Sequence, residues 1–492
     1  MKLGFLSDIH LPAHRQAPQY AALHHALQAL RQSGIDLLVI PGDFTADGDK
    51  EAAAFFLQTL QSTGLPFVLQ IGNSDLRTPE TQTDLLAYAA PTLHRCGSTT
   101  LLALHDADRR LSAEDITALH AISGDGSGVI LSLHHPIRTL EPEYASRLLD
   151  WLEIHPRAHA FFAHCHFARE EGRLHWLPAL DPDKAIGGSA FALWDTGTES
   201  IQVVTQPCQP PPDLLPLLGF SAYNPLSDLA WAAEQHISCI ELRPNALLCD
   251  QAALTEAVAH WRTAGGSNLS LHAPDVYWSD GPGDETVWQK AIDLALSLHA
   301  DRLTVHVPQV SVQDAAQTQI LAALAAFLAR HLRRLPAGCA IGIENMHMTA
   351  KDRPDDSRRY GYLPQEWLVY ADLVEQHLGR AVGINLDIGH ARNNAPFSQR
   401  YPVGSWYAAV GNRTVGYHLH QVTDTPQGFV NHTPFTGFTQ PLISLESFFF
   451  MWRTGSLNHV PVILEICPDE LDPAPYRQTL RLFRDAVGKD SQ

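Results

Sequence analysis

The stretch Leu3-Gly-Phe-Leu-Ser-Asp-Ile-His10 decides how the first part of the chain folds. Its apolar residues form a short run, which is typical of a buried strand. Asp8 and His10 follow where the run ends, and side chains at positions i and i+2 point to the same face of a strand. The stretch therefore predicts a buried strand that ends in two ligands for a divalent metal.

Outward from this stretch, strands and helices alternate as far as about residue 206. Apolar spacing predicts a helix over residues 20–32, and an apolar run closed by Pro-Gly predicts a strand over 36–40. A helix over 50–63 and a strand over 67–73 follow. Runs at 190–194 and 200–205 predict a closing hairpin. This alternation predicts an α/β domain.

Polar side chains of the metal-binding kind stand at the ends of these strands. Besides Asp8 and His10 they are Asp43, Asn73, His134, His164 and His166. Oxygen and imidazole ligands of this mix suit Mn, Fe or Zn, and two such metals can share one carboxylate. His135 is expected to point to the opposite strand face from His134. The sequence therefore predicts a dinuclear site in which His134 is the ligand.

The motifs Asp8-Ile-His10, Gly42-Asp43, Gly72-Asn73, His134 and His164-Cys-His166, in this order, resemble those of the calcineurin-like metallophosphoesterase family. The resemblance spans residues 1 to about 205. It implies a four-layer α/β domain over residues 1–206. One metal would be held by Asp8, His10 and His166, and the other by Asn73, His134 and His164. Asp43 would bridge the two metals and take part in catalysis.

One position departs from that family pattern. The family usually has His directly after the Asn, where it can protonate the leaving group, and this chain has Ser74. Serine is a poor general acid near neutral pH. The departure predicts a preference for good leaving groups, or an acid from elsewhere. A second, mild departure is Ala163 in place of the Gly that usually precedes the His-x-His.

A Pro-rich segment, residues 207–216, separates this part from a second pattern of strands and helices over residues 217–492. Eight strand–helix units in about 270 residues match the size of a TIM barrel. The predicted strands are Leu217–Ala222, Cys239–Arg243, Leu269–His272, Leu303–Val307, Ala340–Asn345, Val382–Asp387, Thr414–Leu419 and Val460–Cys467. The second half therefore predicts a (β/α)8 TIM barrel.

Metal-type ligands also stand at the carboxyl ends of the barrel strands or in the loops that follow. They are His272, His306, Glu344, Asp387, His390, His418, His432 and Glu465. Catalytic residues of TIM barrels lie at this face. A cluster of buried carboxylates would be costly without a cation. The pattern therefore predicts a second metal site.

The barrel resembles the xylose isomerase-like barrels and, within them, endonuclease IV. The resemblance rests on Ser-Leu-His272-Ala-Pro, Ile-Glu344-Asn, Leu-Asp387-Ile-Gly-His390, His418-Leu and His432-Thr-Pro-Phe. It implies two or three ions of Zn or Mn. The first ion would be held by His272, His306 and Glu344. The shared pair would be held by Glu344, Asp387, His418 and Glu465, and the third ion by His390 and His432. The family's Asp two residues before the last His is Val430 here, so the third site is short of one ligand.

The same fold carries sugar isomerases, which need only the set Glu344, Asp387, His418 and Glu465. Glu344 and Glu465 are the predicted catalytic residues of the barrel. The additional histidines favour multinuclear phosphodiester cleavage over isomerisation. Arg353 and Arg392, in the insertions after the fifth and sixth strands, are predicted to bind substrate phosphate.

Composition limits the partners and the compartment. A net charge of −19 disfavours broad nucleic-acid binding. Seven cysteines without a C-x-x-C pair favour a reducing cytoplasm. No membrane-spanning segment or signal peptide is evident.

Together these features predict a cytoplasmic, metal-dependent hydrolase of phosphate esters. Its substrate would be a nucleotide-like or cofactor-like small molecule, and the co-occurrence of the two domains suggests sequential steps. Three alternatives stay open for the barrel: a sugar or sugar-phosphate isomerase or epimerase, a DNA-repair AP endonuclease, and a non-catalytic binding module.

Overall fold

The computed structural model describes residues 1–488 except 16, 90–92, 279–283, 349–356, 394–396, 398–400, 402, 427, 440–441 and 467–472. The chain divides into two compact units. One comprises Met1–Cys208 and Thr439–Ser447, and the other Gln209–Phe438 and Phe448–Gln492. The Pro-rich segment contains a 3-10 helix, η3 (Pro212–Leu217), which belongs to the second unit.

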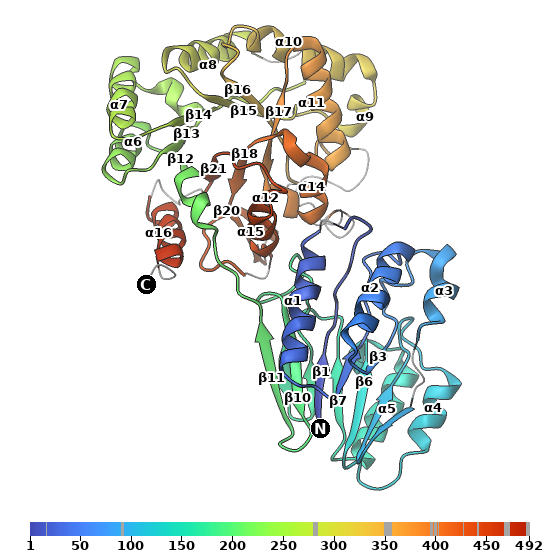
Figure 1. Ribbon diagram of the computed structural model, residues 1–492. Coiled ribbons are helices and arrows are strands. Elements are labelled where there is room, and N and C mark those ends of the chain that lie inside the picture. Colours follow the sequence, from blue (N-terminus) through green and yellow to red (C-terminus); the bar gives the residue numbers. More distant parts are fainter. Residues whose placement is uncertain are drawn as a thin grey trace. The chain divides into compact units, whose positions relative to one another are not determined.

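The first unit contains two sheets (Figure 1). The first has the order β11-β10-β1-β2-β3, with β1 Lys2–Phe5, β2 Leu37–Ile40, β3 Phe67–Leu69, β10 Ala190–Asp195 and β11 Ser200–Thr205. The second has the order β4-β5-β6-β7-β9-β8, with β4 Leu93–Cys96, β5 Thr99–Ala103, β6 Val129–Leu133, β7 His159–Phe162, β8 Arg169–Glu171 and β9 Leu174–Trp176.

Three buried apolar clusters show how these sheets and the helices are layered. One cluster joins the two sheets, with Phe5 of β1 stacked on Phe161 of β7. A second packs α1 (Pro18–Gln32) and α2 (Lys50–Thr63) on the first sheet, and a third packs α4 (Ala113–His120) and α5 (Pro142–Ile154) on the second. The short helix α3 is Gln82–Leu86. The predicted four-layer α/β arrangement is therefore confirmed.

Helix α2 shows how local sequence sets an element's limits. The carboxylate of Asp49 accepts a hydrogen bond from the Ala52 N–H, which caps the helix start. Gly64 ends the helix in the left-handed conformation, with φ 70°. The predicted range, 50–63, matches the observed one.

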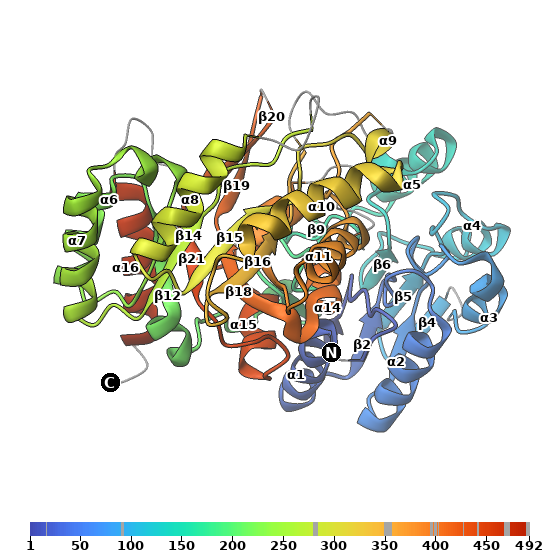
Figure 2. The ribbon, with the colours of Figure 1, turned by 90° about the horizontal axis from the view of Figure 1, so that it is seen from above.

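The second unit is built on a closed barrel of eight parallel strands (Figure 2). They are β12 Leu218–Ala222, β13 Cys239–Leu242, β14 Asn268–His272, β15 Arg302–His306, β16 Ala340–Glu344, β17 Gly383–Asp387, β18 Thr414–Leu419 and β21 Val462–Leu464. Pairing of β12 with both β13 and β21 closes the ring. The predicted TIM barrel is confirmed, and each observed strand overlaps a predicted one.

Helices and a hairpin follow the barrel strands along the chain. The helices are α6 Pro225–Glu234, α7 Gln251–Thr263, α8 Glu285–Ser297, α9 Val312–Ala315, α10 Thr318–Leu332, α11 Pro364–Leu378, α12 Ile388–Arg392, α14 Val403–Val410, α15 Glu446–Arg453 and α16 Ala474–Gly488. The hairpin consists of β19 (Gln421–Thr425) and β20 (Gly428–Thr433). Within the described residues, none of the helices has the length and apolarity to cross a bilayer.

Candidate metal centres

The predicted ligands of the first unit converge at the strand ends. Asp43 Oδ2 lies 3.8 Å from His10 Nε2 and 3.5 Å from His134 Nε2. His134 Nε2 is also 2.9 Å from Asn73 Oδ1, and His166 Nε2 is 3.5 Å from Asp8 Oδ1. Asp43 thus stands between the two ligand groups, where a bridging carboxylate is needed.

Most of these ligands have unusual backbone conformations. Asp8, His10, Asp43, His164 and His166 all have φ between 49° and 66°, the left-handed region that residues other than Gly rarely adopt. Such strain tends to gather at functional sites, where the surrounding structure holds it. The conformations re-aim the side chains after the strands end.

A buried carboxylate holds the central loops together. Asp75 accepts hydrogen bonds from the backbone N–H groups of Asp43, Gly72 and Thr45, at 2.9, 2.9 and 2.8 Å. Burial, together with the neighbouring charge of Asp43, raises the pKa of Asp75 to about 7. Sequence reasoning gave Asp75 no role, although it directly follows the Asn73-Ser74 motif.

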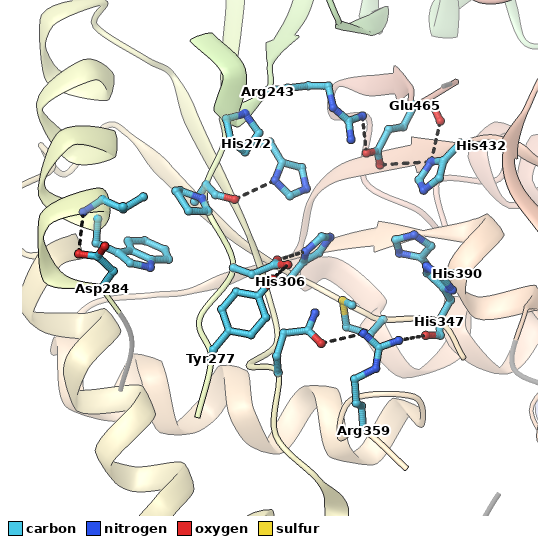
Figure 3. A pocket seen from close by; sticks show the side chains of 18 residues that line it. Arg243, His272, Tyr277, Asp284, His306, His347, Arg359, His390, His432 and Glu465 are labelled. Atoms are coloured by element: carbon cyan, nitrogen blue, oxygen red, sulfur yellow. Dashed lines mark hydrogen bonds and ion pairs between the residues drawn. The ribbon is translucent and has the colours of Figure 1, made fainter. Parts of the chain in front are cut away.

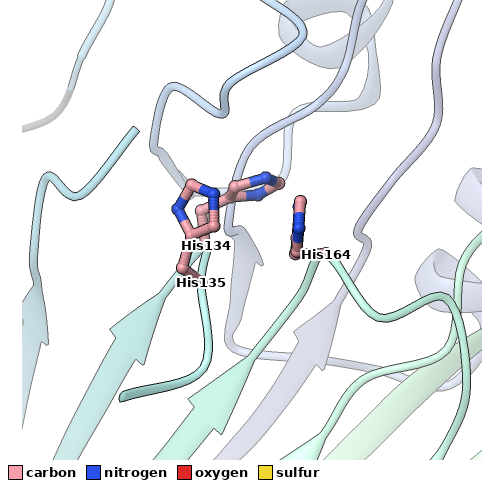
Figure 4. A group of neighbouring side chains, drawn as sticks. All are labelled: His134, His135 and His164. Carbon is pink, nitrogen blue, oxygen red and sulfur yellow. The ribbon is translucent and has the colours of Figure 1, made fainter. Parts of the chain in front are cut away.

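Two positions in this centre bear on the sequence predictions. The expectation that His135 points away was wrong, because its ring centroid lies 4.5 Å from that of His164 (Figure 4). His134, His135 and His164 form one group of potential ligands. Ser74 donates from its N–H and its Oγ to the Asp43 carboxylate, at 2.7 and 3.0 Å. It therefore positions the carboxylate expected to bridge.

The barrel holds the second convergence, at the carboxyl ends of six successive barrel strands, β14 to β18 and β21. Glu344 Oε2 is 3.7 Å from His272 Nε2 and 3.2 Å from His418 Nδ1, and Glu344 Oε1 is 3.5 Å from His306 Nε2. Asp387 Oδ2 lies 3.8 Å and Glu465 Oε2 2.8 Å from His418 Nδ1. The groups predicted for the first two ions are thus assembled.

The donor atoms of this centre fit bound cations. Several are buried and lack a hydrogen-bond partner among the described residues: His272 Nε2, His306 Nε2, Glu344 Oε1, Asp387 Oδ2, His390 Nε2 and Glu465 Oε2. Buried polar atoms are almost always satisfied in native proteins. Imidazole nitrogens and carboxylate oxygens aimed at one another form a ligand set for Zn or Mn.

Two carboxylates that sequence reasoning missed orient these histidines. Glu241 Oε1, inside β13, lies 2.9 Å from His418 Nε2, and Asp275 Oδ1 lies 2.6 Å from His306 Nδ1. Despite burial, which opposes ionisation, the pKa of each carboxyl falls to about 2 through its histidine partner. Each leaves the other ring nitrogen aimed at Glu344, as metal-binding histidines require.

His420 is a further histidine that sequence reasoning missed. It lies with His390 and His432 in one group of potential ligands. Its position directly after β18, two residues after His418, was the available signal, because ligands gather at the carboxyl ends of barrel strands. Val430, which stands where the family has Asp, is 47% exposed on β20.

A cavity of about 600 Å³ opens onto the barrel centre (Figure 3). The arginines lining it are Arg243 and Arg359, and Tyr277 also faces it. Arg243 Nη1 is 2.9 Å from Glu465 Oε1, and Arg359 Nη1 donates to Gln309 Oε1 at 2.7 Å.

The two arginines predicted to bind substrate have different outcomes. Arg353 lies outside the described residues. Arg392 ends α12, where burial lowers its pKa, and it is not among the described residues that line the cavity. Arg243 and Arg359 are the described arginines placed to meet a substrate there.

Family comparisons agree with these two centres. Residues 229–486, more than half of the chain, match the family model described as xylose isomerase-like TIM barrel. The chain therefore belongs to this family. Residues 1–185 match the calcineurin-like phosphoesterase model. Both sequence resemblances are confirmed.

Individual relatives are more distant. A protein from Xenorhabdus bovienii (strain SS-2004) named probable cyclic nucleotide phosphodiesterase is 32% identical over 87 residues, which cover 15% of this chain and 34% of the relative. The match thus spans about a third of the curated relative's length.

Similar solved structures cover the barrel. Endonuclease IV from Thermus thermophilus is 16% identical, covers 56% of this chain and 100% of its own, and has a TM-score of 0.40. A 3-keto-D-glucoside 4-epimerase from E. coli is 14% identical over 55% of this chain and 99% of its own, with a TM-score of 0.38. At these identities the similarity concerns the fold alone.

Proposed function

We propose that the chain is a metal-dependent hydrolase of phosphate esters, with a dinuclear phosphoesterase domain and a multinuclear barrel that cleaves a phosphodiester. The observation that carries the proposal is the convergence of buried imidazoles and carboxylates in two separate places, each with a shared carboxylate, Asp43 and Glu344. The match of residues 1–185 to the calcineurin-like phosphoesterase model supports hydrolysis.

In both centres, bound divalent cations would act as Lewis acids toward a phosphoryl oxygen and toward water. The first centre suits a pair of Mn, Fe or Zn, and the barrel suits two or three ions of Zn or Mn. Asp43 and Glu344 would hold neighbouring cations at a fixed spacing. Arg243 and Arg359 line the barrel cavity, where their guanidinium groups would orient an anionic substrate.

The substrate we propose is a small nucleotide-like or cofactor-like phosphodiester. A cavity of about 600 Å³ suits a small molecule, and Tyr277, 56% exposed at its wall, offers an aromatic face. The net charge of −19 weighs against duplex DNA and thus against an AP endonuclease. Cys165, Cys239, Cys249 and Cys339 form no disulfide, in keeping with the cytoplasmic location that we propose.

The test uses the full-length chain, D43N and E344Q, each loaded with Mn or Zn. Hydrolysis of bis(p-nitrophenyl) phosphate and p-nitrophenyl phosphate is measured. We expect E344Q to lose hydrolysis of the diester and to keep hydrolysis of the monoester, and D43N to show the opposite, because the two centres lie in different units. A metal-loaded wild type that hydrolyses neither substrate, nor any other activated diester, would favour a binding module.

A sugar isomerase or epimerase is the second candidate for the barrel. Glu344, Asp387, His418 and Glu465 form a buried group of potential ligands that is complete without the other histidines. Incubating the D43N chain with ketoses in D2O distinguishes the two candidates. Deuterium incorporation at a sugar carbon without phosphate release supports the isomerase.

A further inference from the structure

Three imidazoles in the barrel, those of His390, His420 and His432, lie next to one another. His390 Nδ1 lies 3.0 Å from the Asn345 carbonyl oxygen, and His432 Nδ1 lies 2.9 Å from that of Glu465. The Nδ1 of His420 lies 3.1 Å from the Gln421 carbonyl oxygen and 2.9 Å from the His432 backbone nitrogen. A proton on each Nδ1, donated to the backbone carbonyl oxygen beside it, leaves the lone pair of each Nε2 for a cation.

These Nε2 edges meet in a small, mostly buried volume. His390 and His420 are 2% and 0% exposed. The ring of His432 has its centroid 5.3 Å from that of His390 and 4.2 Å from that of His420. His390 Nε2 has no hydrogen-bond partner among the described residues, and one ligand atom from each of the three histidines lies within 4.8 Å of the others.

The surrounding backbone is shaped to seat His420. A Cβ on Gly389 would lie 1.9 Å from His420 Cε1, so any larger residue at 389 would displace this ring. His432 adopts a left-handed conformation, φ 58°, which is uncommon outside Gly. The first feature restricts position 389 to Gly, and the second strains the backbone at His432. Both bring the imidazoles together.

From this geometry we infer that His390, His420 and His432 form an all-histidine cation site, distinct in chemistry from the carboxylate-rich pair beside it. His420, from the end of β18, supplies the ligand that position 430 does not. Three neutral ligands leave the full +2 charge on the ion, which would attract a phosphate oxygen. Imidazole-only sites favour Zn, Co, Ni or Cu over Mn or Mg, which prefer carboxylates.

His420 Nε2 also lies 3.0 Å from Asp387 Oδ1, so the alternative is a histidine that only supports this carboxylate. The metal content separates the two possibilities. A supporting histidine would not add an ion of its own, whereas a ligand would.

The experiment counts ions per full-length chain by elemental analysis after chelation and reloading with Zn or with Mn. Wild type is compared with H420A and G389A; the second keeps all three imidazoles. The matched control is H347A, since the His347 ring is tilted against that of His390, with centroids 4.6 Å apart, but lies outside the group. We expect H420A and G389A each to hold one zinc fewer than wild type, and H347A to hold the wild-type number. Wild type should hold one manganese fewer than zinc.

Cobalt substitution gives a readout that needs no variant. A cobalt ion held by three imidazoles should add a strong visible absorption, typical of four-coordinate Co²⁺, to the wild-type spectrum. The inference is overturned if H420A keeps every zinc, if manganese fills as many sites as zinc, or if no such band appears. It rests on the proposed multinuclear barrel. A barrel that hydrolyses diesters with two ions contradicts this inference alone, whereas one without metal contradicts both.

Discussion

At the scale of single residues, a buried carboxylate that is not itself a predicted metal ligand shows the electrostatic cost of burial. Asp181 is 1% exposed and accepts hydrogen bonds from Gln19 Nε2 and the Asp183 N–H, both at 2.9 Å. Lys184 Nζ, at 4.0 Å, is too far for a strong pair. Burial therefore raises the pKa of Asp181 to about 7.

This raised pKa predicts a pH-dependent loss of stability. The folded chain keeps a proton on Asp181 that the unfolded chain releases above pH 3.8, so stability falls as pH rises from about 4 to 7. The D181N variant keeps the acceptor oxygen and removes the charge. We expect D181N to have a higher free energy of unfolding than wild type at pH 8, seen as a higher urea midpoint. The gain should be a few kcal/mol at most, since one pKa unit is about 1.4 kcal/mol.

The comparison is made in EDTA at pH 5 and pH 8, with D125N as control. Asp125 is exposed, and Ser127 lowers its pKa. Removing its charge should therefore leave the change in stability between these pH values as in wild type. A D181N chain that gains no stability between pH 5 and 8 relative to wild type would refute the assignment.

Asp275 acts on metal binding through another residue. Its carboxylate holds the Nδ1 side of His306 at 2.6 Å, which aims Nε2 at Glu344. Loss of such a partner typically lowers metal affinity about 10–100-fold. We expect D275A to lower zinc affinity by that factor in a chelator competition, and D275N to lower it less because Asn can still accept the bond.

The matched control for Asp275 is Asp284, which lines the same cavity but caps α8 at Thr286 N–H, 2.9 Å away. D284N should keep both the cap and the zinc affinity. Equal zinc affinity in D275A and wild type would show that His306 needs no carboxylate partner.

At the scale of elements, the first centre depends on how closely two loops approach. A Cβ on Gly72, after β3, would lie 2.2 Å from Asp43 Oδ1 and 2.4 Å from Asp43 N, after β2. Neither group can move freely, because Asp75 and Ser74 hold both. The Gly-Asp and Gly-Asn motifs thus reflect the same contact.

Replacing Gly72 should therefore damage one centre selectively. We expect G72A to lower the free energy of unfolding by about 1–3 kcal/mol, the usual cost of overpacking, and to lose the ions of the first unit while the barrel keeps its own. Elemental analysis and urea unfolding measure both effects. G338A is the control, since a Cβ there meets nothing within 4 Å. Full metal content in G72A would contradict this account.

Periodicity in the sequence predicted the strands and helices. It also led to the ligands, because they stand at the strand ends. Each of Asp8, His272, Glu344 and Asp387 ends or follows an apolar run, so topology places Asp8 in the first centre and the other three in the barrel centre. His135 was mispredicted because strand alternation stops where β6 ends, at Leu133. Glu241 could not be assigned, since a single carboxylate inside a strand reveals its partner only in three dimensions.

At the scale of the whole molecule, two candidate metal centres in one chain would give two separate sources of stability. Without cations, the barrel carboxylates rely on protonated histidines. Burial disfavours that charge, but Glu241, Glu344 and Glu465 raise the pKa of His418 well above its usual value. In the metal-free barrel, a proton on His418 thus offsets part of the negative charge of these carboxylates.

Metal removal should consequently destabilise the chain more at high pH than at low pH. A histidine with a raised folded pKa contributes stability that is complete below pH 6.5 and is lost as pH rises through the folded pKa. Cations replace those protons, and binding at 100 times the Kd adds about 2.7 kcal/mol per independent site. We expect zinc to raise the Tm of the chelated chain at pH 6, and to raise it further at pH 9.

The variants D43N and E344Q divide this effect between the units. In E344Q the zinc-dependent shift should shrink to the part contributed by the first unit, and in D43N to that of the barrel, because each removes a carboxylate shared by two ions. Differential scanning calorimetry at both pH values measures the shifts. A wild-type Tm that zinc leaves unchanged at pH 9 would mean that the buried carboxylates are satisfied without cations, and the metal-dependent chemistry of both centres would fall with it.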